Sequence, residues 1–405
     1  MGSSELASGR QQTRVAFRSG SRRSASLIAP LLWIAGQLAC AVPEAADKQL
    51  PDTAARMAEI VSALEITLPL AQSREAFEAP GARAELDSAL RNLARNASAL
   101  ELHRAEDSPG FRFFSRRLAE DAEEISKRFR AGSRDEARFL VNQLVDDCAG
   151  CHVRLPDPRE HTLGVPLTRS LARAEPRVRA KLLVATRQFD AALASYEALF
   201  ASPDYSLSTL DFAGAIEDYL VIALRVRGDW ARAERALAGL AARDDAPAYL
   251  AELIAGWRSA LVDLAPLAQS ATLMDARAVL ARAEAVRRFP ADRSALVHDL
   301  IASSLLQRSL ARGFASADEA AEASYLLGVA ELRSDPARSL PQAEAYLEAA
   351  IRGLPGSDLA REAYALLEEQ TLLGWIGSGG LDLPSDVSDW LHELREIARA
   401  GEKQP

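Results

Sequence analysis

A five-residue segment, Cys148-Ala149-Gly150-Cys151-His152, restricts this chain more than any other feature of its sequence. In a helix the two thiols and the imidazole lie at positions i, i+3 and i+4, so all three side chains project from one face. A Cys pair followed directly by His is the pattern of covalent haem attachment, in which both thiols add to the haem vinyl groups and the imidazole binds the iron. The segment therefore predicts one haem c on Cys148 and Cys151, with His152 as proximal iron ligand.

Three other interpretations of the cysteine pair stay open. A thioredoxin-like dithiol needs the pair at the start of a helix in a fold with strands, whereas this pair follows a long helical pattern. A zinc site could use both cysteines, His152 and His161, although structural zinc usually takes a second, separately spaced ligand pair. A structural disulfide would fit an oxidising compartment. The directly following His favours haem over all three.

The first 41 residues have the pattern of a signal peptide for export. Five Arg residues precede an apolar stretch, residues 27–35, and the small residues Ala39-Cys40-Ala41 follow, so we expect cleavage after the last of these. Pro30 interrupts the apolar stretch, which makes a retained membrane anchor the weaker alternative. Lipidation of Cys40 and a true start downstream of Met1 are further alternatives. Residues 1–41 thus predict a periplasmic protein, with membrane association only if the segment is retained or lipidated.

The chain is acidic, with a formal net charge of −9. Removal of residues 1–41, which hold five Arg and one Glu, changes the net charge to −13. A nucleic-acid partner is not expected, because binding to a phosphate backbone requires a positively charged face. A redox protein partner fits the charge better.

Between Pro51 and Val153 apolar residues recur at helical spacing in four segments, separated by Gly, Pro and Ser. The fourth segment opens at Ser133, and Glu136 three residues later predicts a capping box. This pattern predicts a four-helix bundle over residues 51–156 with a cofactor in its interior. The apolar stripes are Met57, Ile60, Val61, Leu64 and Leu68; Leu86, Leu90, Leu93, Ala97 and Leu100; Phe114, Leu118, Ala122, Ile125 and Phe129; and Ala137, Leu140, Leu144, Cys148 and Cys151.

Four such helices with Cys-x-x-Cys-His near the end of the last one resemble the cytochrome c-prime family, including its six-coordinate, low-spin relatives. The resemblance covers residues 51–156 and rests on one specific motif and the helix layout. In that family the first helix covers the distal haem face with a bulky apolar residue or a Met ligand, which implies Met57 as possible distal iron ligand. Alternatively, Met57 fills the core or His103 binds the iron. Arg154 partly matches a basic or aromatic residue of the family, but Val153-Arg154-Leu155-Pro156 stops the helix early.

Beyond a linker over residues 157–167, marked by Pro and Gly, the pattern is again helical. Aromatic and small residues recur in blocks that resemble tetratricopeptide repeats (TPR) over residues 168–373, and a last helix over residues 385–400 would cap the stack. An Ala-rich helical domain that only mimics the repeat is the alternative. The chain is therefore predicted to be all-α, with a four-helix bundle followed by a TPR-like α-solenoid.

These features predict an electron-transfer protein whose helical repeat domain docks a redox protein partner. Binding or sensing of a gas ligand, NO or CO, is one alternative, and a TPR-type scaffold with a structural haem is another. No catalytic residue is expected, because a peroxidase-like haem enzyme needs a distal acid–base pair that the sequence does not reveal. His161, His298 and His392 stand alone, without neighbouring Cys or carboxylate–His patterns.

Overall fold

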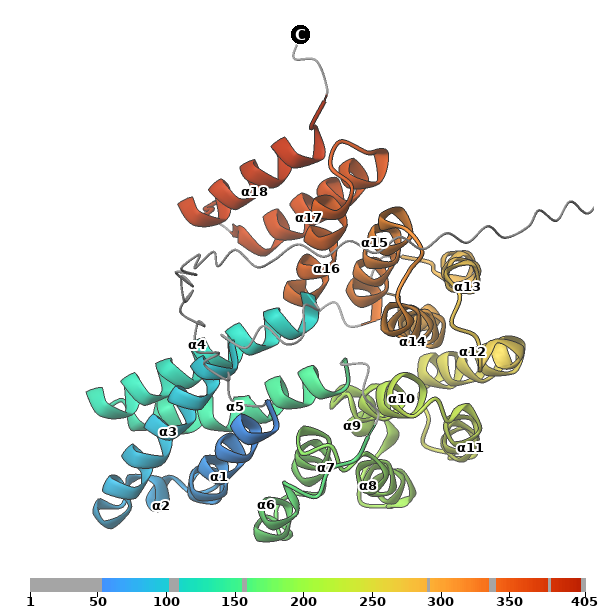
Figure 1. Ribbon diagram of the computed structural model, residues 1–405. Helices are drawn as coiled ribbons and strands as arrows, with labels where there is room; N and C mark the ends of the chain where they lie inside the picture. The colour runs from blue at the N-terminus through green and yellow to red at the C-terminus, as the bar shows by residue number, and fades with distance from the viewer. Residues whose placement is uncertain are drawn as a thin grey trace, which may run out of the picture. The chain divides into compact units, whose positions relative to one another are not determined.

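The structure is a computed structural model that describes residues 53–101, 109–154, 159–289, 292–334, 340–377 and 380–401 (Figure 1). All of them belong to one compact unit, Leu50–Pro405. The described chain is helical apart from one short antiparallel pair, β1 (Ile376–Gly377) and β2 (Gly380–Leu381). Within these ranges no helix is long and apolar enough to cross a membrane. The predicted signal peptide, residues 1–41, and His103 lie outside the described residues.

Four long helices correspond to the four segments with helical spacing. They are α1 (Thr53–Ala71), α3 (Arg83–Glu101), α4 (Pro109–Ala131) and α5 (Arg134–His152), with α2 (Arg74–Glu78) and the 3-10 helix η1 (Pro80–Ala82) between α1 and α3. Helices α1 and α4 each contact both α3 and α5. The apolar stripe predicted on the second segment is buried along its whole length, from Leu86 to Leu100. Periodicity alone therefore predicts which face of α3 is covered by its neighbours.

The start of α5 differs from the prediction. Gly132, at φ +91°, ends α4 in the left-handed conformation that glycine adopts without strain. Ser133 is the N-cap of α5, but its side chain makes no capping hydrogen bond. The predicted capping box is wrong, because Glu136 forms an ion pair with Arg128 of α4 instead. This pair joins α4 to α5 at the end of α5 opposite His152.

Beyond α5 the chain continues as helices, most of which contact the next one in sequence. One segment, η2 (Val221–Val226), is a π-helix, a rare form that often occurs at functional sites. The others are α6 (Val165–Ser170), α7 (Pro176–Ala185), α8 (Phe189–Ala201), α9 (Leu207–Phe212), α10 (Ala215–Leu220), α11 (Trp230–Ala241), α12 (Ala248–Leu264), η3 (Ala265–Leu267), α13 (Leu273–Val286), η4 (Arg293–Ala295), α14 (Leu296–Arg312), α15 (Ala317–Ser334), α16 (Leu340–Gly353), α17 (Asp358–Trp375) and α18 (Ser385–Ala398).

The apolar core of α1 to α5 extends past the predicted linker. Leu167 of α6, Leu171 after it and Leu182 of α7 belong to the same buried cluster as the stripes of α1 to α5. Conversely, Val153, directly after α5, is buried in the cluster formed by α7 to α16. Helix α16 also contacts α4. The end of α5 therefore lies between two apolar cores and is fixed by both.

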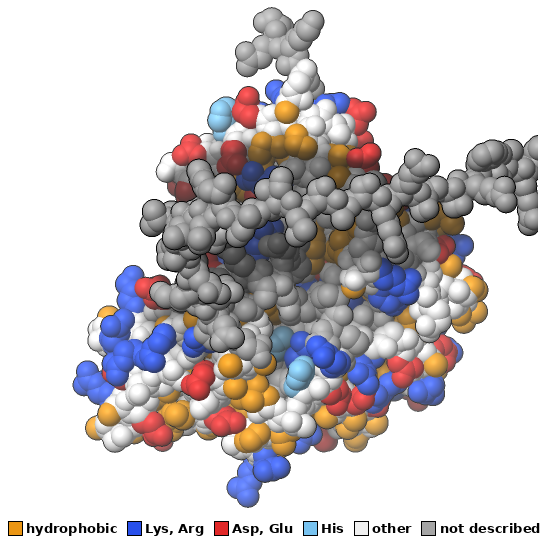
Figure 2. Space-filling model, viewed as in Figure 1, with side chains coloured by type: hydrophobic (Ala, Val, Ile, Leu, Met, Phe, Trp, Pro, Cys, Tyr) orange, Lys and Arg blue, Asp and Glu red, His pale blue; other side chains and the backbone are white. Residues whose placement is uncertain are grey.

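Charged side chains of both signs are interspersed over the described residues on the face shown in Figure 2. Some of them form ion pairs between neighbouring helices, such as Arg258 with Glu234 (Nη2 to Oε1 2.7 Å). Exposed pairs of this kind each contribute about 0–1 kcal/mol. The stability of the molecule therefore rests mainly on its buried apolar clusters.

Candidate functional site

Helix α5 presents Cys148, Cys151 and His152 to one cavity, which we call the motif cavity. Its other walls come from α1, α3, α4, α6 and α7 and are mostly apolar. They include Ile60, Val61, Leu64, Leu68, Leu100, Phe111, Phe114, Leu118, Leu167 and Leu182. The cavity has a volume of about 50 Å³, enough for a few water molecules at about 10–15 Å³ each but far too small for a porphyrin.

Met57 of α1 lines this same cavity and is half-buried. The structure therefore brings together residues that lie about ninety positions apart in the sequence, the thioether of Met57 and the motif residues of α5. Thioether, thiol and imidazole are the side chains that attach and coordinate a c-type haem. We infer that this set could hold an iron porphyrin, provided that the walls separate.

The imidazole of His152 is neutral at pH 7. Burial, with a smaller effect of the positive charge of Arg187, lowers its pKa to about 4, against hydrogen bonding with the backbone of Ala185 and Val184, which raises the pKa. The Nδ1 atom is buried without a hydrogen-bond partner. A neutral imidazole with one ring nitrogen held by backbone and the other without a partner is the form in which histidine binds metals.

The thiol of Cys148 is protonated in the absence of a cofactor. Burial raises its pKa to about 12, and the neighbouring carboxylate of Asp147 adds to the rise. A thiol with such a raised pKa is a weak nucleophile at pH 7. This property counts against a thioredoxin-like role, in which an exposed thiolate with a lowered pKa attacks a disulfide.

Three further histidines lie in the described part of the chain, and none of them lines the motif cavity. His161 is exposed and its backbone N–H donates to the carbonyl of Arg187 (3.4 Å). His392 is exposed on α18, whereas His298 is buried in α14, where burial lowers its pKa. In the part of the chain that the structure describes, no group of three or more His, Cys, Asp or Glu side chains is arranged to hold a metal ion. The zinc interpretation therefore gains no support.

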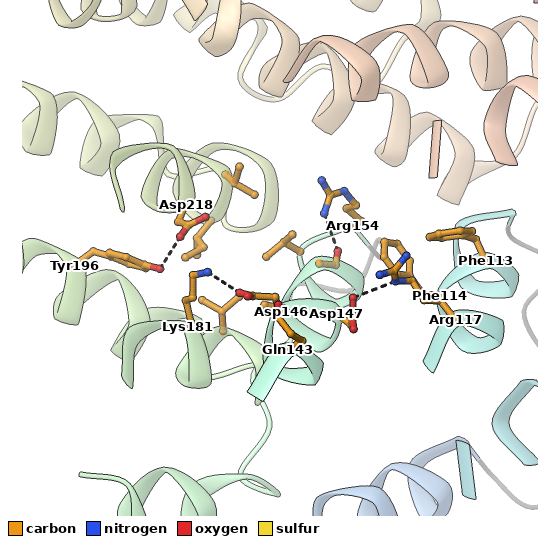
Figure 3. Close-up of a pocket in the computed structure, with 16 residues that line it drawn as sticks. Phe113, Phe114, Arg117, Gln143, Asp146, Asp147, Arg154, Lys181, Tyr196 and Asp218 are labelled. Carbon is orange, nitrogen blue, oxygen red and sulfur yellow. Dashed lines mark hydrogen bonds and ion pairs between the residues drawn. The ribbon is translucent and has the colours of Figure 1, made fainter. Parts of the chain in front are cut away.

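A second cavity, which we call the polar cavity, lies along another face of α5 (Figure 3). It has a volume of about 350 Å³ and is bordered by three polar pairs. Lys181 Nζ lies 2.6 Å from Asp146 Oδ1, Arg117 Nε lies 3.2 Å from Asp147 Oδ1, and the hydroxyl of Tyr196 donates to Asp218 (3.2 Å). Apolar side chains, among them Val153, Val184 and Ile222, form the rest of its lining.

The two cavities share two residues, Phe114 and Asp147. Burial raises the pKa of Asp147 to about 6, Arg117 opposes this rise, and Asp121 adds to it. The sequence analysis missed the polar cavity, because Lys181, Tyr196 and Asp218 come from segments beyond the predicted linker. The sequence holds one sign of this cavity, the adjacent carboxylates Asp146 and Asp147 directly before Cys148. Charged side chains are unusual on a helix face next to an apolar site.

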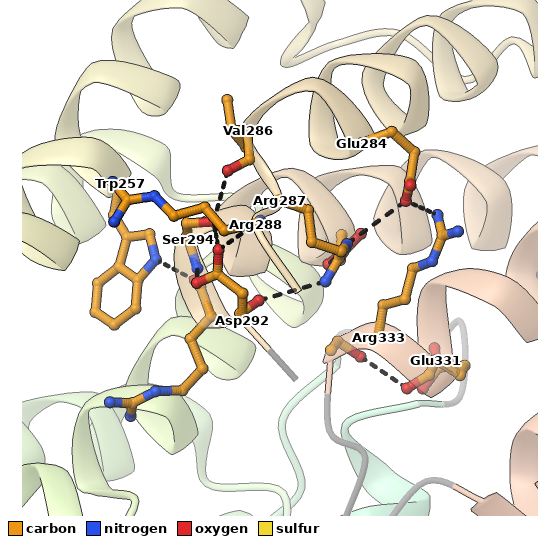
Figure 4. A network of polar contacts seen from close by, with 12 residues as sticks. Trp257, Glu284, Val286, Arg287, Arg288, Asp292, Ser294, Glu331 and Arg333 are labelled. Atoms are coloured by element: carbon orange, nitrogen blue, oxygen red, sulfur yellow. Dashed lines mark hydrogen bonds and ion pairs between the residues drawn. The ribbon is translucent and has the colours of Figure 1, made fainter. Parts of the chain in front are cut away.

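A third polar group lies among α12 to α15 (Figure 4). Arg287 Nη2 lies 2.7 Å from the buried Asp299 Oδ2, and Arg333 Nη1 lies 2.6 Å from Glu284 Oε1. The indole of Trp257 donates to the carbonyl of Arg293 (2.8 Å). Burial raises the pKa of Asp299 to about 6, against the lowering by Arg287. These contacts join helices to one another and lie apart from both cavities.

Comparison with known proteins adds nothing to this picture. No family model, curated protein or solved structure matches this chain. The functional argument therefore rests on the motif, the motif cavity and their chemistry.

Proposed function

We propose that this chain is an exported monohaem c-type cytochrome that transfers electrons. One observation carries the proposal: Met57, Cys148, Cys151 and His152 line a single, largely apolar cavity. Side chains of this chemistry in this arrangement match the requirements of a covalently held, six-coordinate haem. In this proposal Cys148 and Cys151 would attach one haem c, His152 would be the proximal iron ligand, and Met57 is the candidate for the distal ligand.

The residues of the motif cavity fit the group chemically. His152 is neutral and has a buried Nδ1 without a partner, so it can bind iron without first losing a proton. The haem supplies one-electron chemistry when bound, and the apolar walls exclude water from it. Because the cavity measures only about 50 Å³, binding requires α1 and α4 to move away from α5. Met57 is well suited to such a movement, since its unbranched side chain adapts to a changed wall.

The cytochrome c-prime-like bundle is part of this proposal. The contacts of α1 and α4 with both α3 and α5 support a four-helix bundle. Two features depart from the simplest form of that bundle: α6 and α7 add Leu167 and Leu182 to its core, and the chain ends α5 directly after His152. The likeness therefore concerns the haem-binding core, and the additions are particular to this chain.

The helices from α7 onward are proposed to form a TPR-like repeat that docks a redox protein partner. Support comes from their consecutive contacts and from the predicted block around Tyr196, which lies in one helix, α8, with Phe189 and Leu193 buried. A stack of helices of this kind binds proteins along one face. With the signal peptide and the acidic net charge, the proposal describes a periplasmic electron carrier with a protein-docking module.

Gas binding is a second candidate function, favoured by the apolar character of the wall around Met57. Val61, Leu64 and Phe111 line the motif cavity beside it, and a five-coordinate iron facing such a wall binds NO or CO. A scaffold whose haem is only structural is the third candidate. It predicts that haem-free protein with both cysteines changed to alanine still captures the partner.

The deciding experiment is production of the full chain in a host that makes c-type cytochromes, followed by intact mass and absorption spectra. A mass increase of one haem and a low-spin spectrum support electron transfer with Met57 bound. A high-spin spectrum instead supports gas binding. Protein without added haem refutes the proposal, and the matched variant Cys148→Ala with Cys151→Ala gives the haem-free reference in the same host.

A further inference from the structure

A buried carboxylate from α15 contacts the end of the motif helix. Glu331 has no exposed surface, and its Oε2 lies 3.1 Å from Arg154 Nε and 3.0 Å from Arg225 Nη1. The hydroxyl of Ser303 in α14 donates to its other oxygen (2.9 Å). Burial alone would raise the pKa of Glu331, but the charges of Arg225 and Arg154 outweigh burial and hold the pKa below its usual value. Glu331 is thus an ionised group enclosed by donors.

Arg154 connects this carboxylate to the motif itself. It stands two residues after His152, and its Nη1 donates to the carbonyl of Gly150 inside the Cys-Ala-Gly-Cys-His segment (3.2 Å). Its own backbone N–H donates to the carbonyl of Cys151 (3.0 Å). The guanidinium of Arg154 therefore links Glu331 to the backbone turn from which Cys151 and His152 project.

Arg225 approaches the same carboxylate from the π-helix η2. Its side chain is 3% exposed, and its backbone carbonyl accepts a hydrogen bond from Ser304 of α14 (3.4 Å). The neighbouring Val221 and Ile222 of η2 line the polar cavity next to α5. The irregular helix thus provides both a wall beside the motif helix and the second cation at Glu331. A π-helix in this position is an independent sign of a functional arrangement.

The charges of Glu331, Arg154 and Arg225 favour one relative arrangement of the segments that carry them. Two guanidinium groups face one carboxylate, so loss of the carboxylate leaves two buried cations close together. Buried ion pairs often add little net stability, but they can select one arrangement of the elements that carry them. Here the elements are the last turn of α5, η2, α14 and α15.

We propose that Glu331 is a positioning residue for the haem ligand His152. By holding Arg154, Glu331 fixes the last turn of α5 and hence the direction of the imidazole and of the Cys151 thiol. The haem geometry then depends on α14, α15 and η2, which belong to the proposed docking module. This inference rests on the proposed function for its meaning, but the restraint on α5 exists with or without haem.

The first test measures hydrogen exchange of the haem-free full chain, made with both motif cysteines changed to alanine. The variant Glu331→Gln keeps the shape of the side chain and removes its charge. We expect exchange in residues 148–154 to accelerate about tenfold, with α12 and α13 unchanged. Glu322→Gln is the matched control, because Glu322 lies on the same helix and forms an exposed pair with Arg277. Equal acceleration throughout the chain, or none, overturns the proposal.

The second test uses the haem-loaded protein with its natural cysteines. We expect Glu331→Gln to change the low-spin spectrum and the reduction potential, Glu331→Asp to restore part of the change, and Glu322→Gln to leave both unaltered. If Glu331→Gln does not fold, Ser303→Ala takes its place. This variant removes one hydrogen bond from the carboxylate, and we expect it to change the spectrum and the reduction potential by a smaller amount. An unaltered spectrum and potential overturn the proposal. If the wild type carries no haem, only the proposed function is refuted. The hydrogen-exchange measurement still tests whether Glu331 restrains the end of α5.

Discussion

The ionisation of Asp147, beside the motif cavity, should make the stability of the protein depend on pH. The side chain of Asp147 is 23% exposed, and burial raises its pKa from 3.8 to about 6, with Arg117 opposing and Asp121 adding to the rise. A carboxyl whose pKa is higher in the folded state disfavours folding once it ionises. Below pH 3.8 both states are protonated and the cost is absent; the cost grows as the pH rises and is complete above pH 6.

The magnitude follows from the shift. A rise in pKa of about 2 corresponds to a loss of about 3 kcal/mol of folding stability once the carboxyl is ionised. Because the side chain retains solvent contact, screening reduces this to about 1–2 kcal/mol. The variant Asp147→Asn cannot ionise, so its free energy of unfolding relative to the wild type should be larger by about 1–2 kcal/mol at pH 8 than at pH 4.

Urea unfolding followed by circular dichroism at pH 4 and pH 8, with wild type and variant in the same haem state, measures this difference. Asp146→Asn is the control. It removes an exposed pair with Lys181 (2.6 Å), which should destabilise the protein by less than about 1 kcal/mol at pH 8. The reasoning is refuted if Asp147→Asn loses stability between pH 4 and pH 8 relative to the wild type, because the Arg117 pair would then outweigh burial.

Four further predictions concern the motif and the buried charges. His152→Ala should abolish the low-spin spectrum of the haem-loaded protein. Cys148→Ala should leave a single thioether, at Cys151, and lower the fraction of chains that carry haem, as measured by intact mass. Met57→Ala should convert a low-spin to a high-spin spectrum if Met57 binds the iron; an unchanged spectrum would assign Met57 to the core. Asp299→Ala should lower the free energy of unfolding by about 1–3 kcal/mol, measured by urea unfolding, because Arg287 loses its buried carboxylate partner and keeps the longer pair with the more exposed Glu284 (3.5 Å).

Helical periodicity predicted the positions of the four long helices because their apolar stripes are continuous and their breaks carry Gly and Pro. The capping box predicted at Ser133 is wrong because the capping rule considers only residues that are close in sequence. The carboxylate of Glu136 instead forms an ion pair with Arg128 of another helix. A local sequence pattern does not reveal that a side chain from another helix competes for the capping carboxylate. Spacing likewise indicated that Cys148 and His152 share a face, because that relation lies within one helix turn.

Long-range parts of the site could not be predicted. Glu331 and Arg225 stand far beyond the motif, and nothing in their neighbourhoods distinguishes them from the other charged residues of an Ala-rich helical chain. Gly164 was assigned to a linker, yet a Cβ at this position would lie 2.4 Å from Thr186, a residue of the motif cavity wall. Its role is a close approach of two segments, which only the folded arrangement reveals.

The shared core at the end of α5 limits how this protein can be divided. A cut at the predicted linker would strip Leu167 and Leu182 from the first core and Val153 from the second, exposing apolar surface on both pieces. Helices α1 to α5 therefore do not form a separable unit. A shortened chain that keeps the walls of the motif cavity must retain α6 and α7, because Leu167 and Leu182 line it.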